Sequence, residues 1–125
     1  MGTTARQVLL VEDDRFLRKA AESALRRAGY AVRLAVDGEE ALAAVRIERP
    51  DLILLDLLMP RLNGIEVLRA LRRDVGTREI PVLVLSNSSR EQDVEEVKRL
   101  GAGYLVKADL SLEALARQVA AALKE

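Results

Sequence analysis

The segment "DLILLD", residues 51–56, decides the fold because it joins a strand-like apolar run to a carboxylate. Its Leu and Ile residues have no helical spacing and no polar interruption, which is typical of a short strand buried on both faces. Asp56 ends this run directly beside the expected core. A lone carboxylate in such a place costs several kcal/mol unless a partner or solvent stabilises it. The rest of the sequence must therefore supply a partner for Asp56.

Apolar runs of similar length alternate with helical patterns along the rest of the chain. We expect strands at 7–11, 30–35, 51–56, 81–86 and 103–107. We expect helices at 14–29, 39–49, 64–74, 90–102 and 110–125. Polar residues that can cap these helices lie near all five expected starts: Asp14, Asp37, Asn63, Ser88 or Ser89, and Ser111. Gly29 can adopt the left-handed conformation that ends the first helix.

The apolar positions of each helix predict which face is buried. The expected stripes are Leu17, Ala20, Ala21, Ala24 and Ala28 in the first helix, Ala41, Leu42 and Val45 in the second, Ile65, Leu68 and Leu71 in the third, Val94, Val97 and Leu100 in the fourth, and Leu112, Leu115, Val119 and Leu123 in the last. Short connections between alternating strands and helices favour right-handed crossovers. The sequence therefore predicts an α/β fold, a doubly wound parallel sheet with helices on both faces.

Composition excludes several classes of function. The chain has 125 residues, enough for one domain, and the expected single domain spans 1–125. Lys plus Arg and Asp plus Glu both number 20, and aromatic residues make up 2%, so direct nucleic-acid binding is not expected. The absence of Cys and His removes thiolate chemistry and the usual zinc ligands. No apolar run approaches the roughly 18 residues of a membrane span, so a cytoplasmic location is expected.

Polar residues lie at, or directly after, the carboxyl ends of four of the five expected strands. They are Glu12 and Asp13, Asp56, Ser86, and Lys107. In the strand order 2-1-3-4-5, one of the two common doubly wound orders, these residues meet at one edge of the sheet. The carboxylates would repel one another without a cation, and Mg²⁺ prefers such oxygen ligands. Asp56 could then be a nucleophile in phosphoryl transfer, with Ser86 and Lys107 holding the transferred group.

The motifs "VLLVEDD", "LLDLLMP", "LVLSN" and "YLVK", in this order, resemble the receiver domain of bacterial two-component response regulators. The resemblance covers nearly the whole chain and implies a flavodoxin-like, or CheY-like, sheet with five helices. It implies that Asp56 accepts a phosphoryl group from a sensor histidine kinase or phosphotransfer protein. Matching positions assign further roles, namely Mg²⁺ binding by Glu12, Asp13, Asp56 and the carbonyl of Leu58, phosphoryl contact by Ser86 and Lys107, and switching by Ser86 and Tyr104.

The same resemblance implies a phosphorylation-dependent switch that loses its phosphoryl group by itself and is not a conventional turnover enzyme. The changing surface would be the face formed by 90–102, 103–107 and 110–125, acting on another protein or on a second copy, since no output domain follows Glu125. The chain departs from the family at Ala108, where proline usually follows the lysine. Leu58 and Asn87 are bulkier than usual beside the acceptor and hydroxyl positions, and we predict that they slow self-dephosphorylation.

Three other functions remain open at this point. A degenerate receiver would only bind partners, although all the expected site residues are present. A haloacid-dehalogenase-like phosphatase also uses an aspartate nucleophile, Mg²⁺, a hydroxyl and a lysine, but needs a second aspartate where this chain has Leu58. A flavodoxin-like flavin binder would need a first loop that accepts a phosphate, and the acidic run at 12–14 would repel one.

Overall fold

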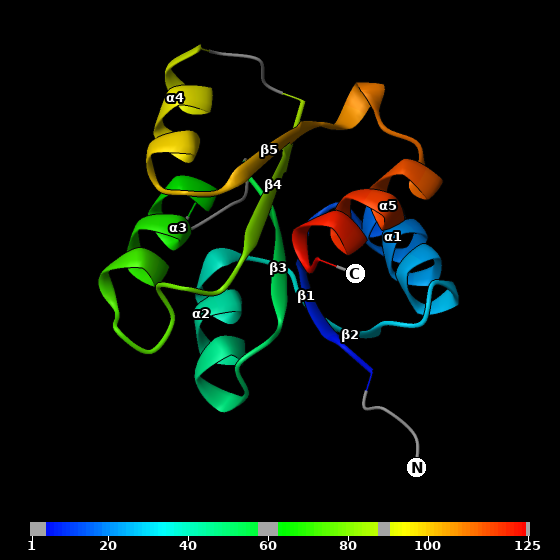
Figure 1. Ribbon diagram of the computed structural model, residues 1–125, viewed down its shortest axis with the longest axis horizontal. Coiled ribbons are helices and arrows are strands. Elements are labelled where there is room, and N and C mark those ends of the chain that lie inside the picture. Colours follow the sequence, from blue (N-terminus) through cyan, green and yellow to red (C-terminus); the bar gives the residue numbers. More distant parts are fainter. Residues whose placement is uncertain (1–4, 58–62, 88–90, 125) are drawn as a thin grey trace.

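The computed structural model of the protein describes residues 5–57, 63–87 and 91–124, in which strands and helices alternate (Figure 1). The strands are β1 (Gln7–Val11), β2 (Ala31–Ala35), β3 (Leu52–Asp56), β4 (Val82–Ser86) and β5 (Gly103–Val106). The helices are α1 (Arg15–Arg27), α2 (Gly38–Ile47), α3 (Gly64–Arg73), α4 (Glu91–Arg99) and α5 (Leu112–Ala122). A single 3₁₀ turn, Lys107–Asp109, follows β5. The expected elements are therefore confirmed, with ends that differ by a few residues.

The five strands form one parallel sheet in the order β2-β1-β3-β4-β5. This order is the predicted one, and it places the most apolar strands, β1, β3 and β4, at the centre. The register pairs Val11 with Leu55 and Asp56 with Leu85. The carboxyl ends of the three central strands therefore lie level with one another, which brings the polar residues that follow them to one edge.

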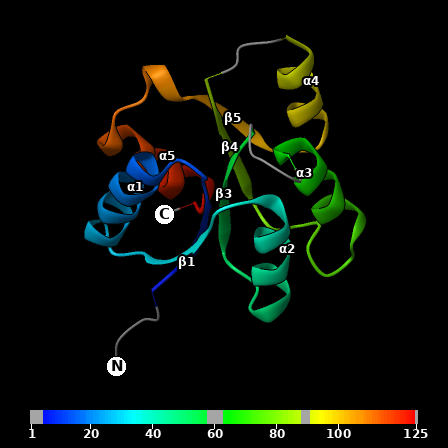
Figure 2. The same ribbon diagram turned by 180° about the vertical axis from the view of Figure 1, so that it is seen from behind.

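Helices cover both faces of the sheet, as Figures 1 and 2 show from opposite sides. On one face α1 and α5 lie side by side over a core that includes Leu10, Leu54 and Leu115. On the other face α2, α3 and α4 cover a core that includes Leu9, Leu55 and Leu68. None of the described helices combines the length and apolar character that a membrane crossing requires.

Side-chain caps fix where the described helices begin. Asp14 accepts a hydrogen bond from the amide of Leu17 at 3.0 Å, and Ser111 accepts one from Ala114 at 3.1 Å. Asn63 and Glu66 form a reciprocal capping box at the start of α3. Asp37 caps α2 in the same way as Asp14 caps α1. These four predicted caps are confirmed, as is Gly29, whose φ of 100° needs a residue without a Cβ. The cap predicted at Ser88 or Ser89 lies outside the described residues.

Some predicted buried stripes are wrong in detail. Leu17 and Leu112 are about two-fifths exposed, and Ala28 is exposed. Leu17 and Leu112 belong to the first turns of α1 and α5, where they line a cavity of about 70 Å³ at the edge of the sheet instead of packing on its face. Leu25, which the predicted stripe leaves out, is fully buried, and Ala28 is the residue after α1 ends at Arg27. The helix spacing set the period of the stripe but not its rotation.

The stripes of α3 and α4 also differ from the expectation. In α3 the buried apolar residues are Val67, Leu68 and Leu71, whereas Ile65 is only partly buried. In α4 only Val97 is fully buried among the side chains that the structure describes, and Val94 and Leu100 are partly exposed. The fourth helix therefore lies more loosely on the sheet than its pattern predicts.

Candidate functional site

The turn after β1 presents two carboxylates to the edge of the sheet. Glu12 is 3% exposed, and its backbone amide donates to the carbonyl of Ala35 at 3.0 Å, which continues the β1–β2 ladder. Asp13 is exposed to solvent. The guanidinium of Arg18 donates to the carbonyls of Glu12 at 3.0 Å and Asp13 at 3.2 Å. Arg18 thus ties the turn to the second turn of α1 and fixes where both carboxylates lie.

Asp56 ends β3 and is 5% exposed. The start of α3 lies against the backbone that follows it, because the amide of Gly64 donates to the carbonyl of Leu57 at 2.9 Å. A Cβ at position 64 would lie 2.6 Å from the carbonyl oxygen of Asp56 and 2.7 Å from the Cα of Leu57. Glycine is therefore required at this position for close approach, and α3 helps to fix the acceptor strand end.

The ammonium of Lys107 lies beside the carboxylate of Asp56 and stabilises its charge. Its Nζ lies 2.7 Å from a carboxylate oxygen of Glu12 and 3.3 Å from one of Asp56. Burial by itself would lower the pKa of the Lys107 ammonium, but the hydrogen bond to Glu12 and the charges of Asp56 and Glu12 raise it above its ordinary value. The lysine therefore stays charged throughout the neutral range and links the ends of β1, β3 and β5.

Three carboxylates share this edge of the sheet. Glu12, Asp13 and Asp56 each offer an oxygen, and these oxygens all lie within 4.8 Å of one another. Within the described part of the chain, Lys107 forms ion pairs with two of the three carboxylates, and Arg18 contacts the backbone beside them, so three formal negative charges face two positive ones. An all-oxygen donor set with one exposed member fits a hard divalent cation that keeps part of its water shell. The residues present therefore suit Mg²⁺.

The remaining predicted site residues lie around this cluster. Ser86 is the last residue of β4, is 1% exposed, and pairs in register with Val106. Because β4 lies next to β3, Ser86 ends the strand beside the one that Asp56 ends. Tyr104 is partly buried and packs against the core under α2, α3 and α4. The proposed carbonyl ligand at Leu58 lies outside the described residues.

Two residues that shape the site were not singled out from the sequence. Arg18 acts through a contact with the backbone, and no sequence motif marks such a contact. Gly64 is expected from the sequence only as the first residue of the helix at 64–74, although the dipeptide Asn63–Gly64 could have suggested a close approach. Both residues position the carboxylates rather than contacting a ligand.

Comparison with known families agrees with this geometry. A family model described as the response regulator receiver domain matches residues 8–120. The protein belongs to the response regulator receiver domain family and is thus a receiver domain of two-component signalling. Receiver domains of this kind bind Mg²⁺ at an acidic pocket and interact with histidine kinases or phosphotransfer proteins.

Particular relatives show how far the likeness extends. Response regulator MprA of Mycobacterium tuberculosis is 44% identical over 115 residues, which cover 89% of this chain and 48% of that protein. This chain therefore spans about half the length of the curated relatives that it matches. The chemotaxis protein CheY4 of Vibrio cholerae matches with a TM-score of 0.88 and 33% identity, over 95% of this chain and 99% of that one. The Mn²⁺-bound response regulator Rcp1 matches with a TM-score of 0.83 and 28% identity, over 93% and 92% of the two chains.

Proposed function

We propose that the protein is a phosphorylation-dependent switch in which Asp56 accepts a phosphoryl group from a histidine kinase or a phosphotransfer protein. The observation that carries the proposal is the position of Asp56, which shares Lys107 with Glu12 inside a cluster of three carboxylates. An ordinary strand-end aspartate needs no second carboxylate and no shared ammonium beside it. The same arrangement disfavours a degenerate receiver.

Each residue of the site would have its own role in phosphoryl transfer. A carboxylate oxygen of Asp56 forms a bond to phosphorus, and the phosphorus–nitrogen bond of the donor's phosphohistidine breaks, with the electron pair returning to the imidazole. Glu12, Asp13, Asp56 and the carbonyl of Leu58 would hold Mg²⁺, which supplies positive charge to the phosphoryl oxygens when bound. Lys107 and Ser86 would contact two of these oxygens. Hydrolysis of the resulting acyl phosphate by water would return the switch to its starting state.

Phosphorylation then changes the charge at the end of the sheet. The phosphoryl group adds strong hydrogen-bond acceptors beside Asp56, within the edge that Ser86 and Lys107 share. We propose that Ser86 moves toward it and Tyr104 turns inward. The surface formed by α4, β5 and α5 would then change its affinity for another protein or for a second copy of the chain. The similarity to Rcp1, a response regulator with a Mn²⁺-bound form, supports the binding of a divalent ion by this protein.

Intact-mass measurement tests the proposal directly. The protein is incubated with Mg²⁺ and acetyl phosphate, and we expect one phosphoryl adduct that EDTA prevents. Asp56→Asn should abolish the adduct, because it removes the nucleophilic oxygen without changing the size of the side chain. Asp14→Asn is the matched control, since asparagine caps a helix as well as aspartate does and Asp14 lies outside the carboxylate cluster.

The two variants make the result decisive. An adduct in the wild type and in Asp14→Asn, but not in Asp56→Asn, would support the assignment. Absence of the adduct from the wild type under these conditions would overturn the proposed function. An adduct of equal yield in Asp56→Asn would place the acceptor elsewhere.

A further inference from the structure

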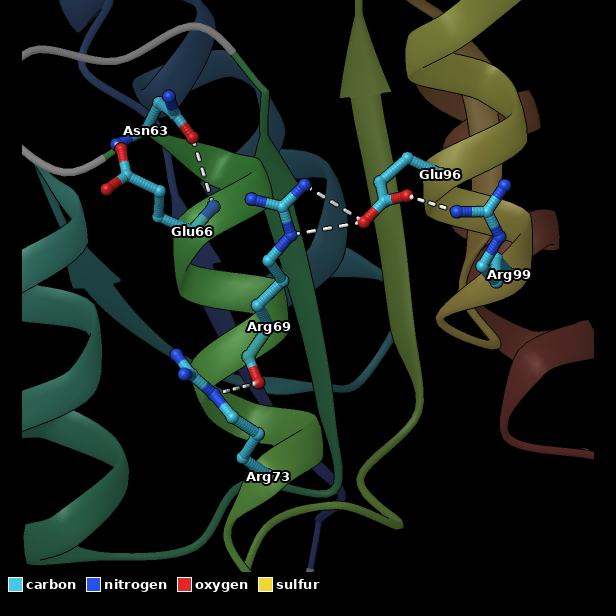
Figure 3. Close-up of polar contacts among 6 residues, drawn as sticks. All are labelled: Asn63, Glu66, Arg69, Arg73, Glu96 and Arg99. Carbon is cyan, nitrogen blue, oxygen red and sulfur yellow. Dashed lines mark hydrogen bonds and ion pairs between the residues drawn. The ribbon is translucent and has the colours of Figure 1, made fainter.

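Helix α4 contacts its neighbour α3 through charged side chains. Arg69 of α3 lies with its Nε 3.1 Å and its second guanidinium nitrogen 3.0 Å from one carboxylate oxygen of Glu96 in α4 (Figure 3). The other oxygen of Glu96 accepts from Arg99, 3.0 Å away on the same helix. The side chain of Glu96 is 21% exposed, so this contact is partly shielded from water. One carboxylate therefore bridges the two helices.

A second arginine of α3 holds the other end of the connection. The Nε of Arg72 donates to the carbonyl of Leu100 at 2.6 Å, and its Nη1 donates to the carbonyls of Ile80 at 2.8 Å and Arg78 at 3.0 Å. These carbonyls belong to the segment after α4 and to the segment before β4. Burial lowers the pKa of the Arg72 guanidinium below its ordinary value, in keeping with its enclosed position. The C-terminal end of α4 is therefore fixed to α3 more firmly than its middle.

Apolar packing contributes little to the position of α4. Val97 is the one described side chain of this helix that is fully buried, while Leu100, just after it, packs partly on the core. At its other end α4 is joined to the site by a short connection, since only residues 87–90 separate Ser86 from Glu91. A displacement of Ser86 must therefore be taken up in that short segment or by α4 itself.

These contacts define a helix that is bound at its C-terminal end by Arg72 and is held to α3 near its middle by the ion pair between Arg69 and Glu96. We propose that Arg69 and Glu96 form a latch that holds α4 in its unphosphorylated position, with the end bound by Arg72 as the pivot about which α4 moves. The inference rests on the proposed function, because phosphorylation at Asp56 is the change that separates Arg69 from Glu96. Releasing the latch should favour the phosphorylated arrangement by the free energy of the lost contact.

Amide hydrogen exchange without any phosphodonor tests the latch itself. Arg69→Gln and Glu96→Gln should each make the amides of α4 exchange roughly two- to five-fold faster, the range for a partly exposed ion pair. The double variant should exchange no faster than Glu96→Gln alone, because Glu96→Gln already removes the contact with Arg69 together with the one to Arg99. Amides of β1 serve as an internal reference and should not change.

Arg73→Gln is the matched control. Arg73 lies on α3 one turn beyond Arg69, and its Nε donates to the carbonyl of Arg69 at 3.4 Å (Figure 3). This contact stays within α3, so removing the charge should leave exchange in α4 at the wild-type rate. Equal effects of Arg69→Gln and Arg73→Gln, or no effect of either, would overturn the latch.

A second measurement tests the connection to the site. With Mg²⁺ and acetyl phosphate, Arg69→Gln should form the Asp56 adduct roughly two- to five-fold faster than the wild type or Arg73→Gln, which follows from the same contact free energy. If the wild type forms no adduct, the proposed function fails while the exchange comparison still decides the latch. If exchange shows the latch but all three proteins form the adduct at one rate, the coupling to phosphorylation is wrong.

Discussion

Helices α3 and α4 lie on the same face of the sheet and are nearly equal in length, with 10 and 9 residues, but they are held in different ways. Helix α3 buries Val67, Leu68 and Leu71 and begins at a capping box. Helix α4 buries Val97 and relies on arginines that extend from α3. Apolar burial holds a helix in one position, whereas a partly exposed ion pair can break at a small cost in free energy. The face therefore combines a helix held by apolar burial, which lies against the backbone of Asp56, with a helix held in large part by polar contacts.

The strongest test of this difference compares two buried valines. Val67→Ala and Val97→Ala remove the same atoms from positions that are 1% and 0% exposed. In both variants the loss of buried apolar surface should lower the free energy of unfolding by about 1.6 kcal/mol. In α3 a cavity term should raise the loss of unfolding free energy to roughly 2–3 kcal/mol, while α4 should shift to fill the space and lose only about 1–2 kcal/mol.

Urea unfolding with an unchanged m-value gives both numbers. Hydrogen exchange adds the location of the change, since Val97→Ala should release α4 alone. Equal losses at the two positions would show that α4 is as firmly packed as α3, and the contrast between the helices would be lost.

The next effect concerns the contact between α3 and the acceptor strand. Gly64→Ala should destabilise the protein by about 2 kcal/mol, because the new Cβ meets backbone atoms of Asp56 and Leu57. It should also slow formation of the Asp56 adduct, since the end of β3 must shift. Gly76→Ala is the control, as its Cβ would meet only a side-chain oxygen of Asp74 at 3.5 Å. A Gly64→Ala protein as stable as Gly76→Ala would contradict the close approach.

A smaller loss is expected where α3 holds the end of α4. Arg72→Lys keeps the charge but has one nitrogen in place of the Nε and Nη1 that reach Leu100 and Ile80, so we expect a loss of about 1.5 kcal/mol. Exchange should rise at Leu100 and Gly101, whose carbonyls Arg72 contacts. Chemical denaturation and exchange measure the two effects. An unchanged stability would mean that Arg72 is not the pivot.

The smallest expected effect is a difference in pH dependence between two stabilising contacts. One is the buried contact of Lys107 in the site, and the other is the partly exposed Arg69–Glu96 pair between the helices. The pKa of Lys107 is raised in the folded state, so its stabilisation is complete below the ordinary lysine value of about 10.4 and is lost as pH rises through the raised value. In EDTA, the difference in unfolding free energy between the wild type and Lys107→Met should therefore shrink above that pH. The difference between the wild type and Arg69→Gln should stay constant, because arginine does not lose its proton there. A constant difference for Lys107→Met would contradict the raised pKa.

Much of the site followed from the sequence because it depends on strand ends. In a parallel sheet the residue after each central strand must lie at the same edge, so Glu12, Asp13, Asp56 and Ser86 could be placed together once the strand order was assumed. Lys107 was predicted at the end of β5, although it begins a 3₁₀ turn there. The contacts of Arg18 could not be foreseen, because they join a side chain to backbone that only folding brings near. The dipeptide Asn63–Gly64 suggests a close approach but does not say which backbone atoms Gly64 meets.

The sequence by itself determined the alternation of strands and helices, the helix caps and the carboxylates at the strand ends. These features arise from neighbouring residues, whose spacing and chemistry act before the chain is folded. Only the tertiary structure decided how each helix is rotated and what holds it, as Leu17, Leu112 and the Arg69–Glu96 pair show. Rotation and contact between helices depend on packing against residues distant in the chain, which local periodicity does not specify.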